Sequence, residues 1–314
     1  MVNIQKVAII GCGFVGATTA FSLIHTGLFS EMVLIDANQN KAEGEAMDLS
    51  HGSAYQNPMK IYAGTYDDIV DAGLIVITAG ANQKPNETRL DLVKKNVEIF
   101  KTIIPEIKIR NCEGILLIVS NPVDILTYVT LKLSGFESHR VIGSGTVLDT
   151  ARFKHVLGQH LEVDPRNIHA YIIGEHGDSE LAVWSGATVA GIDINHFCEL
   201  RGHFKHQEAM NHLYQEVRDS AYEIINRKGA TYYGVAVAVS RIATAIVKNE
   251  HAVLPISTLM NGEFGLHDIY LSIPSIIGNK GVEKVIDIAL NKEEKQKLLD
   301  SASALQNVIQ QLDV

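Results

Sequence analysis

The sequence is poor in several features that would place it in other protein classes. Its three cysteines, Cys12, Cys112 and Cys198, are too few and too scattered for a disulfide framework or a zinc knuckle. Its apolar runs are far shorter than the ~18 residues that a membrane span requires. The chain also opens directly into an expected strand at residues 6–10, without a signal peptide. These features predict a cytoplasmic protein that does not enter a membrane.

Positive charge is also scarce. The 27 Lys and Arg residues are outnumbered by 36 Asp and Glu residues, which gives a formal net charge of −9. Nucleic acid is held by clustered Lys and Arg, so we do not expect it as a partner. A small anionic substrate is still compatible, because one or two local cations outweigh a distant negative field. With 314 residues, the chain has room for one large or two ordinary domains.

A glycine-rich motif follows the first expected strand. Gly11-Cys12-Gly13-Phe14-Val15-Gly16 lies between residues 6–10 and an amphipathic stretch, and Asp36 ends the next apolar run twenty residues later. In a G-x-G-x-x-G motif the first glycine makes a tight turn, the second admits a pyrophosphate, and the third lets helix and strand pack closely. Asp36 would bond a ribose 2′-hydroxyl and repel a 2′-phosphate. The motif therefore predicts NAD rather than NADP.

The alternation of strand and helix continues through the first half of the chain. Residues 74–78 and 114–120 read as buried strands, each followed by a polar loop and a helix. This pattern predicts an α/β fold with a doubly wound parallel sheet of the Rossmann type. Ligands in such sheets lie beyond the carboxyl ends of the strands, where Arg89 and Asn121 fall. Alternatively, Arg89 belongs to a solvated loop, and Asn121 caps a helix in which Pro122 is the first residue.

Two charged residues stand on the helix expected from residue 147 to 160. Asp149 and Arg152 are three positions apart, so they project from one face of that helix. They could form an ordinary surface ion pair, which contributes little. Their apolar neighbours instead suggest a partly buried face. There, an acid could orient a histidine and an arginine could grip a carboxylate with two hydrogen bonds.

His176 is the strongest candidate for such a histidine. It lies within Gly174-Glu175-His176-Gly177-Asp178, after the apolar residues 171–173 that read as the end of a buried strand. The glycines allow a sharp bend and leave room beside the imidazole, as proton transfer to a substrate requires. A lone histidine between glycines is more often part of a surface turn. Its partners elsewhere in the chain therefore decide its role.

The remainder of the chain changes character. Residues 208–227 and 232–249 read as long helices, and Thr231 before the second is either an N-cap or a hydroxyl lining a pocket. Residues 252–259, 269–277 and 282–290 read as antiparallel strands, and a capping box at Asn291 starts the last helix. We therefore predict a nucleotide-binding domain at 1–144 and a mixed α+β substrate domain at 145–314. No metal is expected, because the spacings of four histidines in one polar stretch match no ligand set: His196, His203, His206 and His212.

Six motifs, taken in order, resemble those of one enzyme family over essentially the whole chain. They are the glycine motif of residues 11–16, Asn82-Gln83-Lys84-Pro85-Asn86-Glu87-Thr88-Arg89-Leu90, Ser120-Asn121-Pro122-Val123-Asp124, Leu148-Asp149-Thr150-Ala151-Arg152-Phe153, the histidine motif of residues 174–178, and Lys228-Gly229-Ala230-Thr231-Tyr232-Tyr233. The sequence resembles the bacterial L-lactate dehydrogenases of the lactate and malate dehydrogenase family. That resemblance implies reversible, NADH-dependent reduction of pyruvate to L-lactate, as in glycolysis and fermentation.

The resemblance also implies roles for individual residues. His176 would be the proton donor and acceptor, Asp149 would hold its tautomer and stabilise its cation, and Arg89 would polarise the carbonyl as its loop closes. The residues implied to bind substrate are Gln83, Arg89, Asn121, Arg152 and Thr231. The residues implied to contact NAD are Gly11, Gly13, Val15, Gly16, Asp36, Lys41, Tyr66, Gly80, Ala81 and Ser144.

Specificity and regulation follow from the same resemblance. Gln83 stands where malate dehydrogenases carry an arginine for a second carboxylate, so pyruvate is expected over oxaloacetate. Similar bacterial enzymes are homotetramers that bind fructose 1,6-bisphosphate through an arginine and a histidine. Here His169 matches, and Lys154 replaces the arginine. Two alternatives remain open: a dehydrogenase of another L-2-hydroxy acid, and a non-catalytic NAD-binding relative.

Overall fold

A computed structural model describes residues 2–81 and 88–313. The first half of the chain alternates strands and helices: β1 (Asn3–Ile10), α1 (Phe14–Ile24), β2 (Glu31–Ile35), α2 (Gln39–His51), β3 (Lys60–Ala63), β4 (Ala72–Ile77), α3 (Arg89–Ile109), β5 (Ile115–Ile118), α4 (Val123–Ser134) and β6 (Val141–Gly143). The second half adds α5 (Val147–Leu161), β7 (Ile168–His169), β8 (Ile172–Ile173), β9 (Leu181–Ala182), β10 (Thr188–Val189), β11 (Ile192–Asp193), α6 (Ile194–Leu200), α7 (His206–Lys228), α8 (Tyr233–Val247), β12 (Ala252–Asn261), β13 (His267–Gly278), β14 (Gly281–Val285) and α9 (Lys292–Ile309). The capping box predicted at Asn291 is present.

The main sheet has the strand order β14-β13-β12-β6-β5-β4-β1-β2-β3. Strands β1 to β6 run parallel, and their order reverses between β1 and β4, which is the point where doubly wound sheets bind ligands. The antiparallel strands β12 to β14 extend this same sheet, because Ser257 of β12 pairs with Gly143 of β6. The predicted fold class is confirmed.

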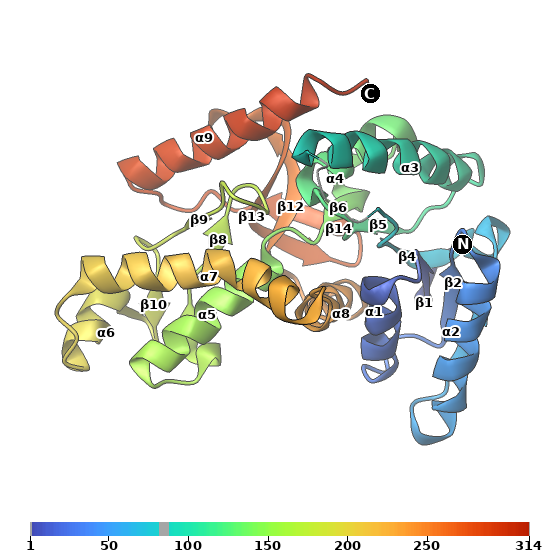
Figure 1. Cartoon of the computed structure of the whole chain (residues 1–314), viewed down its shortest axis with the longest axis horizontal. Helices are drawn as coiled ribbons and strands as arrows, with labels where there is room; N and C mark the ends of the chain where they lie inside the picture. The colour runs from blue at the N-terminus through green and yellow to red at the C-terminus, as the bar shows by residue number, and fades with distance from the viewer. Residues whose placement is uncertain (1, 82–87, 314) are drawn as a thin grey trace.

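Both faces of the parallel sheet are covered by helices, as its strand sequences require. Along β1, Val7 and Ile9 pack on the face that α1 and α8 cover, whereas Ala8 and Ile10 pack on the face of α3 and α4. Successive side chains of a strand point to opposite faces, so a strand buried on both sides is apolar throughout. Figure 1 shows α3 and α9 above the sheet and α1 and α8 below it.

Two local predictions were wrong. Pro122 is not the first residue of α4 but its N-cap, because its backbone is still extended at φ −74° and ψ 118°; Asn121 therefore precedes the cap and does not provide it. The last strand ends at Val285 rather than at residue 290, because the segment between β14 and α9 leaves the sheet after Ile286 bonds to Pro274. The predicted domain boundary falls between β6 and α5 and stays a prediction.

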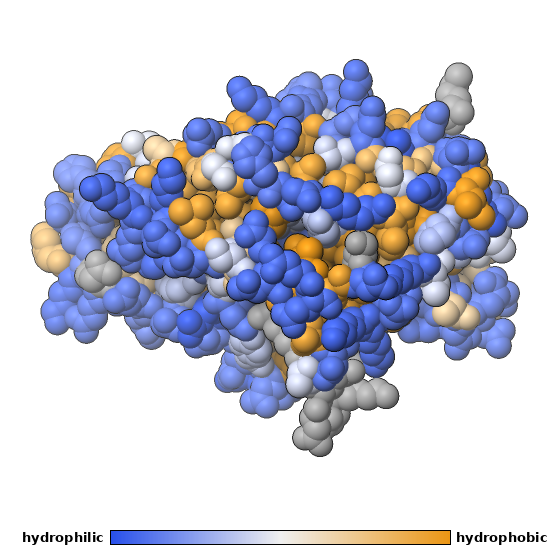
Figure 2. All heavy atoms as spheres, turned by 90° about the horizontal axis from the view of Figure 1, so that it is seen from above, coloured by the Kyte–Doolittle hydropathy of each residue, from blue (hydrophilic) through white to orange (hydrophobic). Residues whose placement is uncertain are grey.

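The molecular surface fits the balance of residues in the sequence. Seen from above the view of Figure 1, the surface is mostly hydrophilic, with smaller hydrophobic areas between the polar side chains (Figure 2). Within residues 2–81 and 88–313, no helix is both long and apolar enough to cross a membrane.

Candidate active site

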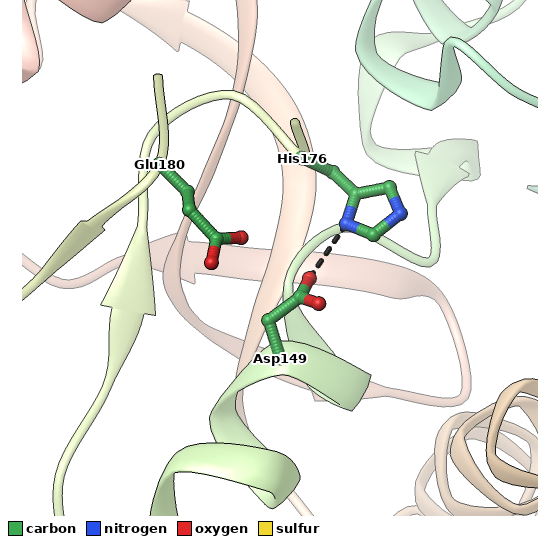
Figure 3. Close-up of side chains that lie close together, drawn as sticks. All are labelled: Asp149, His176 and Glu180. Carbon is green, nitrogen blue, oxygen red and sulfur yellow. Dashed lines mark hydrogen bonds and ion pairs between the residues drawn. The ribbon is translucent and has the colours of Figure 1, made fainter. Parts of the chain in front are cut away.

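The structure brings His176 together with Asp149 and Arg152, from which it is distant in the sequence. The Nδ1 atom of His176 lies 2.6 Å from Oδ2 of Asp149, and Nη1 of Arg152 donates to Oδ1 of the same carboxylate at 2.8 Å. The Asp149 side chain is only 5% exposed, and that of His176 is 24% exposed. Asp149 and Arg152 come from the first turns of α5, and His176 comes from the loop after β8, as Figure 3 shows for the His–Asp pair.

Charge on the imidazole is stabilised at this position. Burial by itself would lower the pKa of His176, but the nearby Asp149 carboxylate outweighs it and raises the pKa to about 9. The charges of His176 and Arg152 hold the pKa of Asp149 below its ordinary value, although burial acts to raise it. His176 is therefore cationic at neutral pH. Its other ring nitrogen, Nε2, faces away from Asp149 (Figure 3), so it can give a proton to a bound molecule.

Three elements from distant parts of the chain hold the His176 loop. Gly174, at φ +93°, exchanges two backbone hydrogen bonds of 2.9 Å with Ser272 of β13. The next N–H, that of Glu175, donates to Oγ of Ser301 on α9 at 2.8 Å. A side chain at position 174 would approach that same Oγ to 2.9 Å, so glycine is required both by conformation and by space.

Asp124 is the third support, and it is buried. Its Oδ2 accepts the backbone N–H of His176 at 2.7 Å, while its Oδ1 accepts the hydroxyl of Ser257 at 2.6 Å. Burial raises the pKa of Asp124 to about 6, although these hydrogen bonds act in the opposite direction. Sequence reasoning gave this residue no role. Its place in the first turn of α4, within the motif Ser120-Asn121-Pro122-Val123-Asp124, was the available signal.

The glycine motif has the geometry that a dinucleotide needs. A Cβ atom on Gly16 would lie 1.9 Å from the carbonyl oxygen of Gly11, so helix α1 can approach β1 only at a glycine. A Cβ atom on Gly13 would meet nothing within 4 Å, which leaves open space beside the backbone. Gly13 is the N-cap of α1, and no side chain caps it. The free N–H groups of this helix terminus fit a pyrophosphate.

Asp36 lies directly after β2, next to this turn. Its Oδ2 accepts the N–H of Cys12 at 2.7 Å, and its Oδ1 accepts the N–H of Asn38 at 2.9 Å. The carboxylate is therefore fixed at the edge of the glycine turn, where an adenosine ribose would lie against it. Of the other positions expected to contact NAD, Val15, Tyr66, Ala81 and Ser144 are half-buried, and Lys41 and Gly80 are exposed.

Asn96 is a second residue that sequence reasoning missed. This α3 residue is 2% exposed; its Oδ1 accepts the N–H of Ala81, and its Nδ2 donates to the carbonyl of Asn121, both at 2.8 Å. It thus ties together the segments that follow β4 and β5. Asn121 itself is exposed, which leaves its side chain available at this edge of the sheet.

The other predicted substrate and effector residues have varied positions. Thr231 is half-buried just before α8. Gln83 lies outside the described residues, as does the side chain of Arg89, whose backbone begins α3. Lys154 is half-buried on α5, His169 is exposed on β7, and these two elements pack together.

In the histidine-rich stretch, His196 and His212 are exposed, but the ring of His203 packs against His160 with centroids 4.6 Å apart.

The fold and the site together define a class of enzyme. An open sheet with parallel strands β1 to β6, a glycine turn with an uncapped helix and an acid after β2 form a dinucleotide site, and on the same chain His176 is bonded to the buried Asp149. These are the parts of an NAD-dependent dehydrogenase. Residues 5–143 match the family model described as the lactate/malate dehydrogenase NAD binding domain, and residues 146–313 match the alpha/beta C-terminal domain of the same family. The chain belongs to the lactate/malate dehydrogenase family.

Individual relatives are similar over nearly their full length. The L-lactate dehydrogenase of Acetivibrio thermocellus is 54% identical over 99% of this chain and 98% of its own. L-lactate dehydrogenase 1 of Clostridium acetobutylicum is 52% identical over 96% of both chains. Among solved structures, the ligand-bound minor L-lactate dehydrogenase of Enterococcus mundtii superposes with a TM-score of 0.96 at 46% identity, covering 99% of each chain.

Proposed function

We propose that this chain reduces pyruvate to L-lactate, reversibly and with NADH, using His176 as the proton donor. The observation that carries the proposal is the triad of His176, Asp149 and Arg152, in which one buried carboxylate holds a cationic imidazole and a guanidinium side by side. A substrate with both a carboxylate and a carbonyl group matches this pair of cations.

Each residue of the triad has a role in the reaction that follows from its chemistry. Arg152 binds the substrate carboxylate, for which a guanidinium offers two parallel N–H groups. NADH, when bound, supplies the hydride that the carbonyl carbon receives. Nε2 of His176 gives its proton to the carbonyl oxygen, and Asp149 keeps the imidazole in the tautomer with Nδ1 protonated. In the reverse direction, the neutral imidazole accepts the proton from the hydroxyl of lactate.

The remaining residues refine binding. Asn121 bonds the carbonyl oxygen, Thr231 lines the pocket, and Arg89 polarises the carbonyl, all by analogy with the family. Gln83 excludes a second carboxylate, because burying that charge without a partner is costly. Replacement of Gln83 by Arg is therefore expected to shift catalytic efficiency from pyruvate toward oxaloacetate. Unchanged efficiencies for the two acids would remove this assignment.

The direct test is oxidation of NADH on addition of pyruvate. We expect turnover by the wild-type enzyme, and we expect His176→Gln to lose most of it while its NADH affinity, measured by fluorescence titration, is kept. An inactive wild-type chain that still binds NADH would favour the non-catalytic alternative. Higher efficiency with 2-oxobutyrate or 2-oxoisocaproate than with pyruvate would favour a dehydrogenase of bulkier 2-hydroxy acids.

We further propose that the chain assembles with copies of itself, as a homotetramer by analogy with the family. Helices α1 and α8 pack together and expose large apolar side chains: Phe14 at 69%, Phe21 at 57%, Tyr233 at 65% and Val237 at 65%. Such a patch is what self-association buries. Light scattering is expected to give a tetramer mass, and Phe21→Glu is expected to reduce it. A monomeric wild-type enzyme would contradict this proposal.

Fructose 1,6-bisphosphate is the proposed effector, held by Lys154 and His169. Burial lowers the pKa of Lys154, so a phosphate group that restores its charge would gain a local partner. Titration with the sugar bisphosphate is expected to raise pyruvate affinity in the wild type and not in Lys154→Gln. An unchanged affinity in the wild type would contradict the proposed effector.

The proposed compartment is the cytoplasm, with which three free cysteines agree.

A further inference from the structure

A second carboxyl group lies beside the His–Asp pair, and the proposed mechanism gives it no task. Glu180 stands just before β9, and one of its carboxyl oxygens lies within 4.8 Å of both an Asp149 oxygen and a ring nitrogen of His176. The residue is only 7% exposed. Figure 3 shows its carboxyl group directed toward Asp149 with no hydrogen bond joining them.

The surroundings of Glu180 oppose its ionisation. Within the described part of the chain, its carboxyl group has no hydrogen-bond or ion-pair partner, whereas Asp149 already has two. The hydroxyl of Tyr214 on α7 donates to the backbone carbonyl of Glu180, not to its side chain. Burial and the neighbouring Asp149 charge raise the pKa of Glu180 to about 8, although His176, Arg152 and Arg218 act against this.

The charged groups that face Glu180 come from three elements. Asp149 and Arg152 lie on α5, His176 lies on the loop after β8, and Arg218 lies on α7 beside the Tyr214 hydroxyl. A substrate carboxylate bound to Arg152 would add a further negative charge to this cluster. An ionised Glu180 would repel that charge and compete for the guanidinium, whereas a neutral Glu180 would do neither.

We propose that Glu180 is a positioning residue for the substrate carboxylate: it must be a neutral acid when pyruvate binds, and its ionisation ends substrate binding at alkaline pH. This inference rests on the proposed roles of His176, Asp149 and Arg152. Substrate binding then requires two protons, one on Glu180 and one on His176. If Glu180 is ionised or His176 is neutral when the substrate arrives, the enzyme takes up the missing proton from solvent as the substrate binds.

The test is the affinity of the enzyme–NADH complex for oxamate, an unreactive amide analogue of pyruvate, measured from pH 6.5 to pH 10. If binding requires two protons, the Kd of the wild type should increase by up to about a hundredfold for each pH unit at the alkaline end of this range. If it requires one proton, the increase should be about tenfold for each pH unit. Glu180→Gln copies the neutral acid in size and charge. We expect this variant to match the wild type at pH 6.5 and to show the shallower rise.

Proton uptake gives a second measurement on the same proteins. Calorimetry in two buffers of different ionisation enthalpy, at pH 9, is expected to show greater uptake on oxamate binding in the wild type than in Glu180→Gln. The control is Asp178→Asn, the same change on an exposed residue of the same loop, which is expected to keep the steep rise.

Each result has a separate meaning. A wild-type Kd that follows a single proton, or a Glu180→Gln variant with the wild-type rise, overturns the role of Glu180. A weakened Glu180→Gln at pH 6.5 with an unchanged rise also overturns it, because a merely structural residue behaves in that way. Failure of the wild type to reduce pyruvate would instead overturn the proposed function.

Discussion

Replacement of Asp149 by Asn tests the centre of the site most directly. Asn keeps the size of the side chain but removes the charge 2.6 Å from Nδ1 of His176. That charge raises the pKa of His176 to about 9 against its ordinary 6.5, a gap equivalent to about 3 kcal/mol. Without it, only the smaller contributions of Glu180 and Asp124 remain to oppose burial, so we expect the pKa of His176 to fall toward its ordinary value.

The expected loss of activity therefore depends on pH. Reduction of pyruvate needs the cationic imidazole, which is nearly fully populated in the wild type at pH 7.5 but falls to about a tenth in the variant. Protonation alone predicts little difference in kcat/KM at pH 5.5, about tenfold at pH 7.5 and about 300-fold above pH 9, where the ratio follows the whole pKa gap. Changes in geometry would add a factor that is the same at every pH.

The assay is kcat/KM for pyruvate reduction by both proteins across this range, with NADH saturating. Asp164→Asn, which removes an exposed partner of Arg166 in the turn after α5, serves as the control and is expected to follow the wild type. The free energy of unfolding is a second measurement. The raised pKa of His176 stabilises the fold in full below pH 6.5, and this stabilisation is lost as the pH rises to about 9. A wild-type to variant ratio of kcat/KM that does not change with pH would refute the electrostatic role of Asp149.

Three further outcomes are expected. Gly16→Ala should lower the free energy of unfolding by about 1–3 kcal/mol, because the new Cβ would lie 1.9 Å from a carbonyl oxygen. Gly13→Ala has open space around the new Cβ, so this variant should keep the melting temperature and weaken NADH binding. Equal melting temperatures for the two variants would contradict this. Asp124→Ala should cost about 1–3 kcal/mol in chemical denaturation and lower kcat, because it leaves the N–H of His176 and the hydroxyl of Ser257 without their acceptor; wild-type kcat would count against it. Ser301→Ala should destabilise by a similar ~1–3 kcal/mol, since it leaves the buried N–H of Glu175 unpaired, and faster hydrogen exchange at that amide is the check.

Local patterns were sufficient to predict most of the fold. The strands and helices of the parallel half follow from apolar runs and the glycine motif, and the ion pair of Asp149 with Arg152 follows from helical spacing. The contact between Asp149 and His176 was inferred from residue chemistry and family resemblance, because 27 positions separate them in the sequence. Their roles in catalysis stay proposals.

The residues that were missed share one property: their contacts depend on how distant elements cross. Asn96 meets Ala81 and Asn121 only because α3 packs over the ends of β4 and β5. Glu180 meets Asp149 only because the chain returns along β9 after the His176 loop. No periodicity or spacing encodes such crossings. Pro122 was misplaced for a simpler reason, since the same residue type suits both the N-cap and the first helical turn.

The anchoring of the His176 loop by Ser301 has a consequence during synthesis of the protein. The loop is made just after the middle of the chain, but one of its supports lies 126 positions later, on a helix that the ribosome releases after every strand of the sheet. Contacts of such long sequence separation form late in folding. A nascent chain that already contains the glycine motif, Asp149 and His176 would still lack this anchor. The complete support of the His176 loop, and with it catalytic competence, is thus expected to arise only after α9 has been made.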